Sequence, residues 1–217
     1  MERKKRPVIV KRKGHSVANS NVPVKKRADF FMKLVLCGDG AVGKTAIRER
    51  FLGRGFSSSY LQTIGADFAS TEKAVEVDNN QYSLNYQIWD LAGQTEFGTV
   101  RKTYYEGCFG SLMVFDITRP ASFENLPAWI NELWENSGRG KVPIVLLGNK
   151  SDLKDKFPEH ITEKQINQYV SDLNVALGED KFFVEYLETS ALTGQNIERA
   201  FDTIGKQVVS WIKANKS

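Results

Sequence analysis

The 217-residue chain has few of the residues that mark disulfide-bonded, zinc-binding or membrane-spanning proteins. It contains two cysteines and two histidines, and their spacing does not match a zinc site. Cys37 and Cys108 both adjoin apolar stretches, so we expect buried free thiols in a reducing compartment. No apolar run reaches the length that crosses a bilayer. The chain begins MERKKR where a secretory signal needs an apolar stretch, which excludes such a signal.

The two ends of the chain lack the residues that carry lipid anchors. The last residues, SWIKANKS, contain no cysteine for prenylation, and the chain begins Met-Glu where myristoylation needs Met-Gly. We therefore expect a cytoplasmic protein without a lipid anchor.

Acidic residues are scarce in only one segment. Residues 1–28 hold ten Lys or Arg and one acidic residue, a net charge of +9, so the rest of the chain carries −5. This segment has no sustained hydrophobic period and contains two prolines, which predicts a disordered extension followed by a globular domain at residues 29–217. The extension could lie on an anionic membrane, which would make the protein peripheral. It could also contact nucleic acid, act as a nuclear-import signal, or stay in solvent.

From residue 30 onwards, short apolar runs alternate with helical spacing. Continuous apolar runs predict buried strands at residues 30–37, 110–117, 142–148 and 182–188, and alternation on both sides of residues 78–80 predicts an antiparallel hairpin. Amphipathic spacing predicts helices, the third capped by Thr162, at residues 44–53, 121–137, 162–177 and 196–216. This order is typical of an α/β fold, here a mostly parallel sheet of about six strands with one antiparallel edge strand and helices on both faces. In such sheets the ligand binds at the carboxyl ends of the strands.

The segment CGDGAVGKT, residues 37–45, can be interpreted as either of two phosphate-binding loops. Its glycines fit the dinucleotide fingerprint Gly-x-Gly-x-x-Gly, and with Lys44-Thr45 they also fit the P-loop. A triphosphate needs Lys44 at its β and γ phosphates and the Thr45 hydroxyl on Mg²⁺. The dinucleotide alternative needs an acidic residue that closes the second strand, whereas Asp67 opens one. The P-loop is therefore favoured, with nucleotide contacts predicted from Gly38, Gly40, Ala41, Val42, Gly43, Lys44, Thr45 and Ala46.

The stretch WDLAGQ, residues 89–94, places polar groups after a predicted strand. Asp90 lies where a carboxylate could hold the metal through water, because Mg²⁺ keeps much of its hydration. The Gly93 N–H could reach the γ-phosphate, and the neutral amide of Gln94 could orient an attacking water without a pKa near 7.

The stretch NKSD, residues 149–152, has the side chains to select guanine. Asp152 offers two acceptor oxygens to N1–H and the 2-amino group, a pair of donors that adenine lacks. Asn149 could bind the base N7 and tie loops together, and Lys150 could lay its methylene stem over the base. As an isolated tetrapeptide, NKSD fits an exposed turn equally well.

A fourth motif, ETSA at residues 188–191, follows the last predicted strand. Backbone N–H groups of Ser190, Ala191 and Leu192, most of all that of Ala191, could donate to guanine O6. The four motifs, in this order and each after a strand, resemble those of the Ras superfamily of small GTPases, from about residue 30 to the end.

The resemblance implies a GTP-binding switch, plausible in membrane traffic or related signalling, that binds GTP or GDP with Mg²⁺ and hydrolyses GTP slowly. It implies that Thr63 ligates Mg²⁺ and senses the γ-phosphate, that Phe56 packs on the guanine and that Tyr60 closes over the phosphates. Hydrolysis would use Gln94 to position water and Lys44 to stabilise charge. A monomer with an exchange factor, a GTPase-activating protein and effectors as partners is implied as well.

Within the superfamily, TIGADF and WDLAGQTEFGTVRKTYYEG are similar to switches I and II of Rab proteins, whereas GDGAVGKT is more like Rho proteins. Phe68, Trp89 and Tyr104 match the aromatic triad that Rabs present to effectors, and they could equally be core aromatics beneath the switches. No arginine has an assured place at the γ-phosphate, so we expect a partner's arginine to raise hydrolysis about 10³–10⁵-fold. The alternative function is a guanine-nucleotide-binding scaffold that does not hydrolyse; the presence of Thr63 and Gln94 argues against it.

Overall fold

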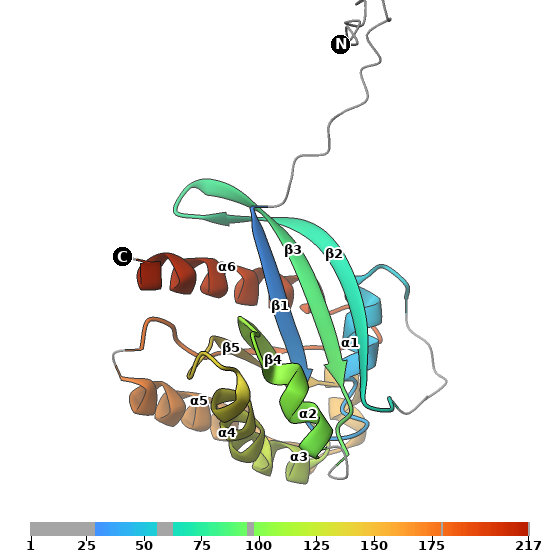
Figure 1. Cartoon of the computed structure of the whole chain (residues 1–217). Helices are drawn as coiled ribbons and strands as arrows, with labels where there is room; N and C mark the ends of the chain where they lie inside the picture. The colour runs from blue at the N-terminus through green and yellow to red at the C-terminus, as the bar shows by residue number, and fades with distance from the viewer. Residues whose placement is uncertain (1–28, 56–62, 95–97, 179, 217) are drawn as a thin grey trace, which may run out of the picture.

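Strands and helices alternate along the residues that the computed structural model describes, which are 29–55, 63–94, 98–178 and 180–216 (Figure 1). The strands are β1 (Phe30–Cys37), β2 (Ala66–Val77), β3 (Asn80–Leu91), β4 (Gly110–Asp116), β5 (Ile144–Asn149) and β6 (Glu185–Glu188). The helices are α1 (Lys44–Phe51), α2 (Gly98–Tyr105), α3 (Pro120–Glu124), α4 (Leu126–Asn136), α5 (Glu163–Leu177) and α6 (Ile197–Lys216), with a 3₁₀ helix at Ser151–Lys156.

The strands form one sheet in the order β2-β3-β1-β4-β5-β6, in which every pair is parallel except β2 and β3. This confirms the predicted mostly parallel sheet with an antiparallel edge strand. Asp78 and Asn79 form the two-residue turn between β2 and β3, with φ of 52° and 60°. Asp and Asn tolerate this left-handed conformation, which gives a turn whose twist matches that of the strands.

Both faces of the sheet are covered by helices (Figure 1). Along β1, Leu34 and Leu36 pack toward α1 and α6, while Val35 and Cys37 pack toward the cluster under α2 to α5. Buried side chains therefore point to both faces, as continuous apolar strands predict. Cys37 and Cys108 are both buried free thiols, as expected. No helix of the described part is long and apolar enough to cross a bilayer.

Two elements differ from their predictions for identifiable reasons. The helix predicted at 121–137 is interrupted at Asn125, because Pro127 has no N–H to continue the hydrogen-bond ladder and instead occupies the first turn of α4. The strand predicted at 182–188 begins only at Glu185. The Asn174 side chain of α5 bonds both the N–H and the C=O of Val184, at 2.6 and 3.0 Å, which keeps that backbone out of the sheet.

The cap predicted for α5 is confirmed. The Thr162 hydroxyl accepts the Gln165 N–H, and the Gln165 side chain accepts the Thr162 N–H at 3.0 Å, which forms a capping box.

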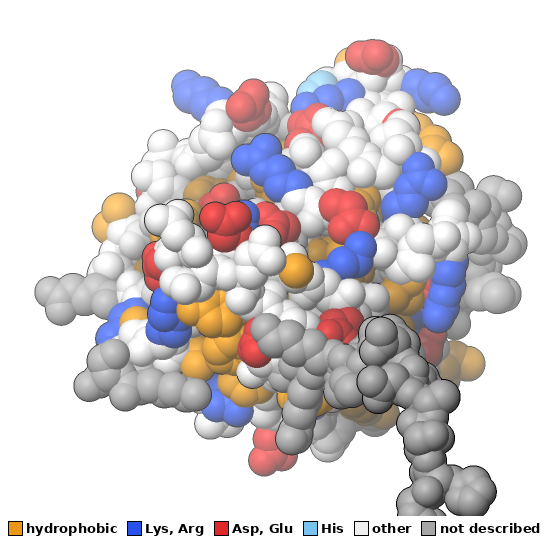
Figure 2. Space-filling model, turned by 90° about the horizontal axis from the view of Figure 1, so that it is seen from above, with side chains coloured by type: hydrophobic (Ala, Val, Ile, Leu, Met, Phe, Trp, Pro, Cys, Tyr) orange, Lys and Arg blue, Asp and Glu red, His pale blue; other side chains and the backbone are white. Residues whose placement is uncertain are grey.

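Acidic and basic side chains are interspersed over the face drawn in Figure 2.

A glycine inside α6 is required by a tyrosine on β3. A Cβ at Gly205 would lie 2.1 Å from the hydroxyl of Tyr86, which is buried and donates to the Phe201 carbonyl at 3.0 Å. We expect Gly205→Ala to destabilise the fold by about 1–3 kcal/mol, because overpacking and a lost hydrogen bond outweigh the gain in helix propensity. Urea unfolding of the wild type and the variant measures this.

The matched control is the same change in a Tyr86→Phe background. Without the hydroxyl, the nearest atoms to the new Cβ lie at 3.1 and 3.2 Å, so the added cost of Gly205→Ala should shrink by more than half. Equal costs in both backgrounds would rule out the Tyr86 hydroxyl as the cause.

Candidate functional site

The loop between β1 and α1 lies at the centre of the sheet's carboxyl edge, with β3 on one side and β4 on the other. This is the point where strand order reverses, the usual ligand position in such sheets. Lys44, the first residue of α1, is 6% exposed and its Nζ donates to the Gly38 and Asp39 carbonyls at 2.6 and 2.7 Å. Burial lowers the pKa of Lys44 to about 8. The ammonium thus lies inside the loop, next to the helix N-terminus that favours anions.

Gly93 and Gly43 pack against neighbouring atoms too closely to carry a side chain. A Cβ at Gly93 would lie 2.4 Å from the backbone of Asp39 and Gly40, and one at Gly43 would lie 2.2 Å from Asn149 Nδ2. At Gly40, in contrast, the nearest atom would be Gln94 Nε2 at an ordinary 3.7 Å. The protein itself therefore does not require glycine at residue 40, and the space beside it faces Gln94.

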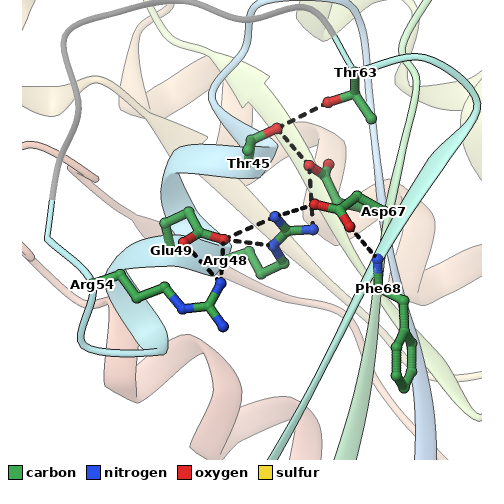
Figure 3. Close-up of polar contacts among 8 residues, drawn as sticks. Thr45, Arg48, Glu49, Arg54, Thr63, Asp67 and Phe68 are labelled. Atoms are coloured by element: carbon green, nitrogen blue, oxygen red, sulfur yellow. Dashed lines mark hydrogen bonds and ion pairs between the residues drawn. The ribbon is translucent and has the colours of Figure 1, made fainter.

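Three oxygen-bearing side chains meet at the start of α1, and Figure 3 shows two of them, Thr45 and Thr63, pointing toward each other. The Thr45 hydroxyl lies 3.2 Å from that of Thr63 and donates to Asp90 Oδ2. Asp90 is fully buried, its Oδ1 has no hydrogen-bond partner among the described residues, and burial raises the pKa of its carboxyl group. Mg²⁺ prefers oxygen ligands, commonly one or two carboxylates together with substrate phosphates. The unpartnered carboxylate oxygen and the two hydroxyls fit such an ion.

One residue of this cluster was missed by the sequence reasoning. Arg48 of α1 is 4% exposed and contacts Asp67 at 2.6 Å, Glu49 at 2.8 Å and, more distantly, Asp90 at 4.0 Å (Figure 3). Its position on the same helix face as Thr45, one turn away, was the only sequence signal. The interactions with Asp67 and Asp90 join residues distant in the chain.

Gln94 and two arginines border a cavity of about 530 Å³. The Gln94 Oε1 atom is buried and, within the described part of the chain, has no partner. Arg101 donates to the Gln94 carbonyl at 2.5 Å and pairs with Glu132 at 3.0 Å, and Arg119 donates to the Gly40 carbonyl at 2.7 Å. The lining consists of Asp39, Gly40, Gly93, Gln94, Arg101, Arg119, Asn125, Ala128, Trp129 and Glu132.

The residues predicted to bind the base meet at the ends of β5 and β6. Asn149 Nδ2 donates to the Val42 carbonyl at 2.8 Å, and its Oδ1 accepts the Ala191 N–H at 3.2 Å. Asn149 therefore ties the P-loop to the loop after β6, and the Ala191 N–H points to Asn149, where we had expected it to be free for guanine O6.

Asp152 and Lys150 are each held by one neighbour. Asp152 Oδ1 accepts the Ser190 hydroxyl at 2.5 Å, and the Lys150 ammonium pairs with Asp116 at 2.6 Å. Leu192 is half-exposed, and its carbonyl accepts a hydrogen bond from Arg50 at 3.1 Å. Lys150 has φ of 68°, so the backbone turns sharply just before Asp152.

The predicted aromatic triad is contiguous. Ring centroids are 5.1 Å apart for Phe68 and Trp89 and 5.5 Å apart for Trp89 and Tyr104. Trp89 and Tyr104 pack on the core, while Phe68 is 48% exposed, so the set has both a core and a surface side. Phe56, Tyr60 and residues 1–28 lie outside the described residues.

The sequence is similar to those of known proteins over most of its length. The family model described as Ras family matches residues 33–210. The chain is 35% identical over 185 residues to Ras-related protein Rab-8B of Homo sapiens, covering 85% of this chain and 82% of that protein. It is 36% identical over 186 residues to Ras-related protein RABA4b of Arabidopsis thaliana, covering 86% and 76%. It is 35% identical over 183 residues to Ras-related protein Rab-8A of Mus musculus, covering 84% and 81%.

Proposed function

The chain belongs to the Ras superfamily, as a Rab-like, GTP-binding small GTPase with a P-loop, and from this we propose that it hydrolyses GTP by direct attack of water on the γ-phosphate. Hydrolysis would convert a GTP-bound conformation into a GDP-bound one, so the output is a binding state. The contacts around the P-loop support this proposal.

The proposed roles follow from the position of each group. The Lys44 ammonium now contacts the Gly38 and Asp39 carbonyls. With nucleotide bound, it would contact the β and γ phosphates and stabilise the negative charge that develops there. Thr45, Thr63 and, through water, Asp90 would hold Mg²⁺. When bound, this ion would neutralise negative charge on the phosphates. Asp152, Asn149, Lys150 and the loop at Ser190–Ala191 would hold guanine.

The observation that carries hydrolysis is the Gln94 amide, whose Nε2 lies nearest the Gly40 Cβ position and whose buried Oε1 has no hydrogen-bond partner among the described residues. A buried acceptor of this kind needs a hydrogen-bond donor, and a water molecule next to the γ-phosphate would supply one while the amide orients it. Arg101 fixes the Gln94 backbone, so the side chain starts from a defined position.

We expect Gln94→Leu to lower the single-turnover rate of GTP hydrolysis by about tenfold to a hundredfold while leaving GTP affinity nearly unchanged, because Leu can neither donate to nor accept from the water. Quenched-flow or filter-binding assays with labelled GTP measure the rate. Gln81→Leu, at the exposed far end of β3, is the matched control. Equal rates for Gln94→Leu and wild type would remove Gln94 from the mechanism. A wild type that binds GTP without hydrolysing it would favour the scaffold alternative.

We also propose that Thr63 and Gly93 couple the γ-phosphate to partner binding. Thr63 precedes β2 and Gly93 follows β3, so loss of the phosphate would release both ends of the surface that carries Phe68 and Trp89. An exchange factor, a GTPase-activating protein and effectors would meet the protein there. The +9 charge of residues 1–28 supports a contact with an anionic surface, either lipid or nucleic acid.

A further inference from the structure

Arg48 is a buried cation beside the proposed metal site that the mechanism above does not use. Its side chain is 5% exposed and lies between two carboxylates from different strands, Asp67 at the start of β2 and Asp90 near the end of β3. The contact with Asp67 is a direct hydrogen bond of 2.6 Å, whereas Arg48 Nη1 remains 4.0 Å from Asp90 Oδ2 (Figure 3).

Two polar atoms of this cluster are buried without a hydrogen-bond partner among the described residues, Arg48 Nη1 and Asp90 Oδ1. Buried polar atoms are usually hydrogen-bonded, and charged ones most of all. The two groups carry opposite charges at a separation where their attraction in a protein interior is substantial. A small movement of Arg48 toward Asp90 would therefore close the 4.0 Å gap to Oδ2 and give Nη1 a carboxylate partner.

We propose that Arg48 is a positioning residue that competes with Mg²⁺ for Asp90, and that the ion pair with Asp67 holds Arg48 away from that carboxylate. This rests on the proposed function, in which Asp90 helps to hold the ion. Two cations that approach one carboxylate repel each other, so a closer Arg48 would weaken the binding of Mg²⁺ there. Where Arg48 lies therefore sets how tightly Mg²⁺, and with it the nucleotide phosphates, are retained.

Asp67 exposes one end of the ion pair with Arg48 to solvent and to protein partners. Its side chain is 59% exposed, and the side chains of Ile64 and Phe68, nearby in the sequence, are exposed as well. Glu49, the other partner of Arg48, is 26% exposed and is shared with Arg54. A protein partner that placed a Lys or Arg against Asp67 would compete for the more exposed of the two carboxylates that hold Arg48, and so promote release of the ion and nucleotide.

The test is release of fluorescently labelled GDP from the full chain across a series of MgCl₂ concentrations. Asp67→Asn removes the charge of the carboxylate closest to Arg48 and leaves only Glu49 to hold it, so we expect the MgCl₂ concentration that halves the release rate to rise about tenfold. Arg48→Met removes the competing cation while keeping an unbranched apolar stem, so that concentration should fall about tenfold. In Arg48→Met, adding Asp67→Asn should change it by no more than about threefold, because no cation remains to be freed.

Glu198→Gln is the matched control, since Glu198 is a similarly exposed carboxylate that pairs with Lys73 on β2, at 3.3 Å and away from Asp90. Opposite shifts for Asp67→Asn and Arg48→Met, both larger than that of Glu198→Gln, support the proposal. Shifts in one direction, or shifts no larger than the control, overturn it. If Arg48→Met does not fold, Asp67→Asn alone decides by the same comparison. A wild type whose GDP release does not depend on MgCl₂, or that binds no GDP, would instead refute the proposed function.

Discussion

Replacing Asp152 with Asn is expected to lower the affinity for GDP by about a thousandfold. Asp152 Oδ1 accepts the Ser190 hydroxyl at 2.5 Å, while Oδ2 has no partner within the described part of the chain. A carboxylate in this position accepts from both N1–H and the 2-amino group of guanine. An amide would place its own N–H₂ against one of those donors, and sites that lose such a buried match discriminate by large factors.

The same substitution should reverse the preference of the site for one nucleotide. Xanthine carries a carbonyl oxygen where guanine carries the 2-amino group, so the new amide can donate to it. We expect Asp152→Asn to bind XDP more tightly than GDP. Equilibrium titration with fluorescent GDP and competition by XDP, GDP and ADP measures this. Asp155→Asn, exposed on the same 3₁₀ helix, is the matched control and should behave as wild type. Unchanged GDP affinity in Asp152→Asn, or wild type binding ADP as well as GDP, would refute this role.

Replacing Lys44 with Met is expected to lower GDP affinity by about a hundredfold to a thousandfold. The ammonium is buried, and two of its three N–H donors meet backbone carbonyls of the phosphate-binding loop at 2.6 and 2.7 Å, which places the charge where the phosphates would bind. Met keeps the length and the apolar stem and loses the charge, so the phosphates would be buried without their cation. Titration with fluorescent GDP measures the loss, and near-wild-type affinity would contradict it.

Lys44 also predicts a pH dependence whose sign can be worked out. Burial lowers the pKa of Lys44 to about 8, so the nucleotide-free protein loses this proton as pH rises through 8. Phosphates bind the protonated form, so binding must restore the proton and affinity must fall with rising pH. Between pH 7.0 and 8.5, wild-type GDP affinity should fall about fourfold. Lys44→Met has no such proton and should lose this slope; an unchanged slope in the variant would assign it to another group.

Local chemistry allowed much of the fold to be predicted. The Asp78-Asn79 turn and the Thr162 cap depend on residues within three positions of each other, and both formed as predicted. The late start of β6, at Glu185, could not be predicted in the same way. It depends on Asn174, ten residues away on another element, whose amide competes with the sheet for the Val184 backbone.

In the candidate site, too, residues placed by the local sequence could be predicted, and contacts between distant segments could not. Lys44, Thr45, Asp90 and Asp152 could be proposed because each lies at a fixed offset from a strand end. Arg48 could not, because on α1 a charged residue usually indicates an exposed face, and only the fold brings Asp67 and Asp90 to it. The position of Ala191 was proposed correctly as part of the loop after β6, but its N–H is bonded to Asn149, a competition that no spacing reveals.

Helix α4 and its N-cap residue Asn125 contact both the loop after β1 and helix α2. Trp129 Nε1 and Asn125 Nδ2 donate to the Asp39 carboxylate at 2.8 and 2.9 Å, while Glu132 holds Arg101, whose guanidinium lies 4.4 Å from the Trp129 ring centroid. Each residue of a helix turns the chain by about 100°. One inserted or deleted residue between 125 and 132 would therefore rotate either the contacts with Asp39 or the contact with Arg101 out of position. Length changes during evolution should therefore be tolerated after the helix, where Gly138 and Gly140 lie in a turn, and selected against within it.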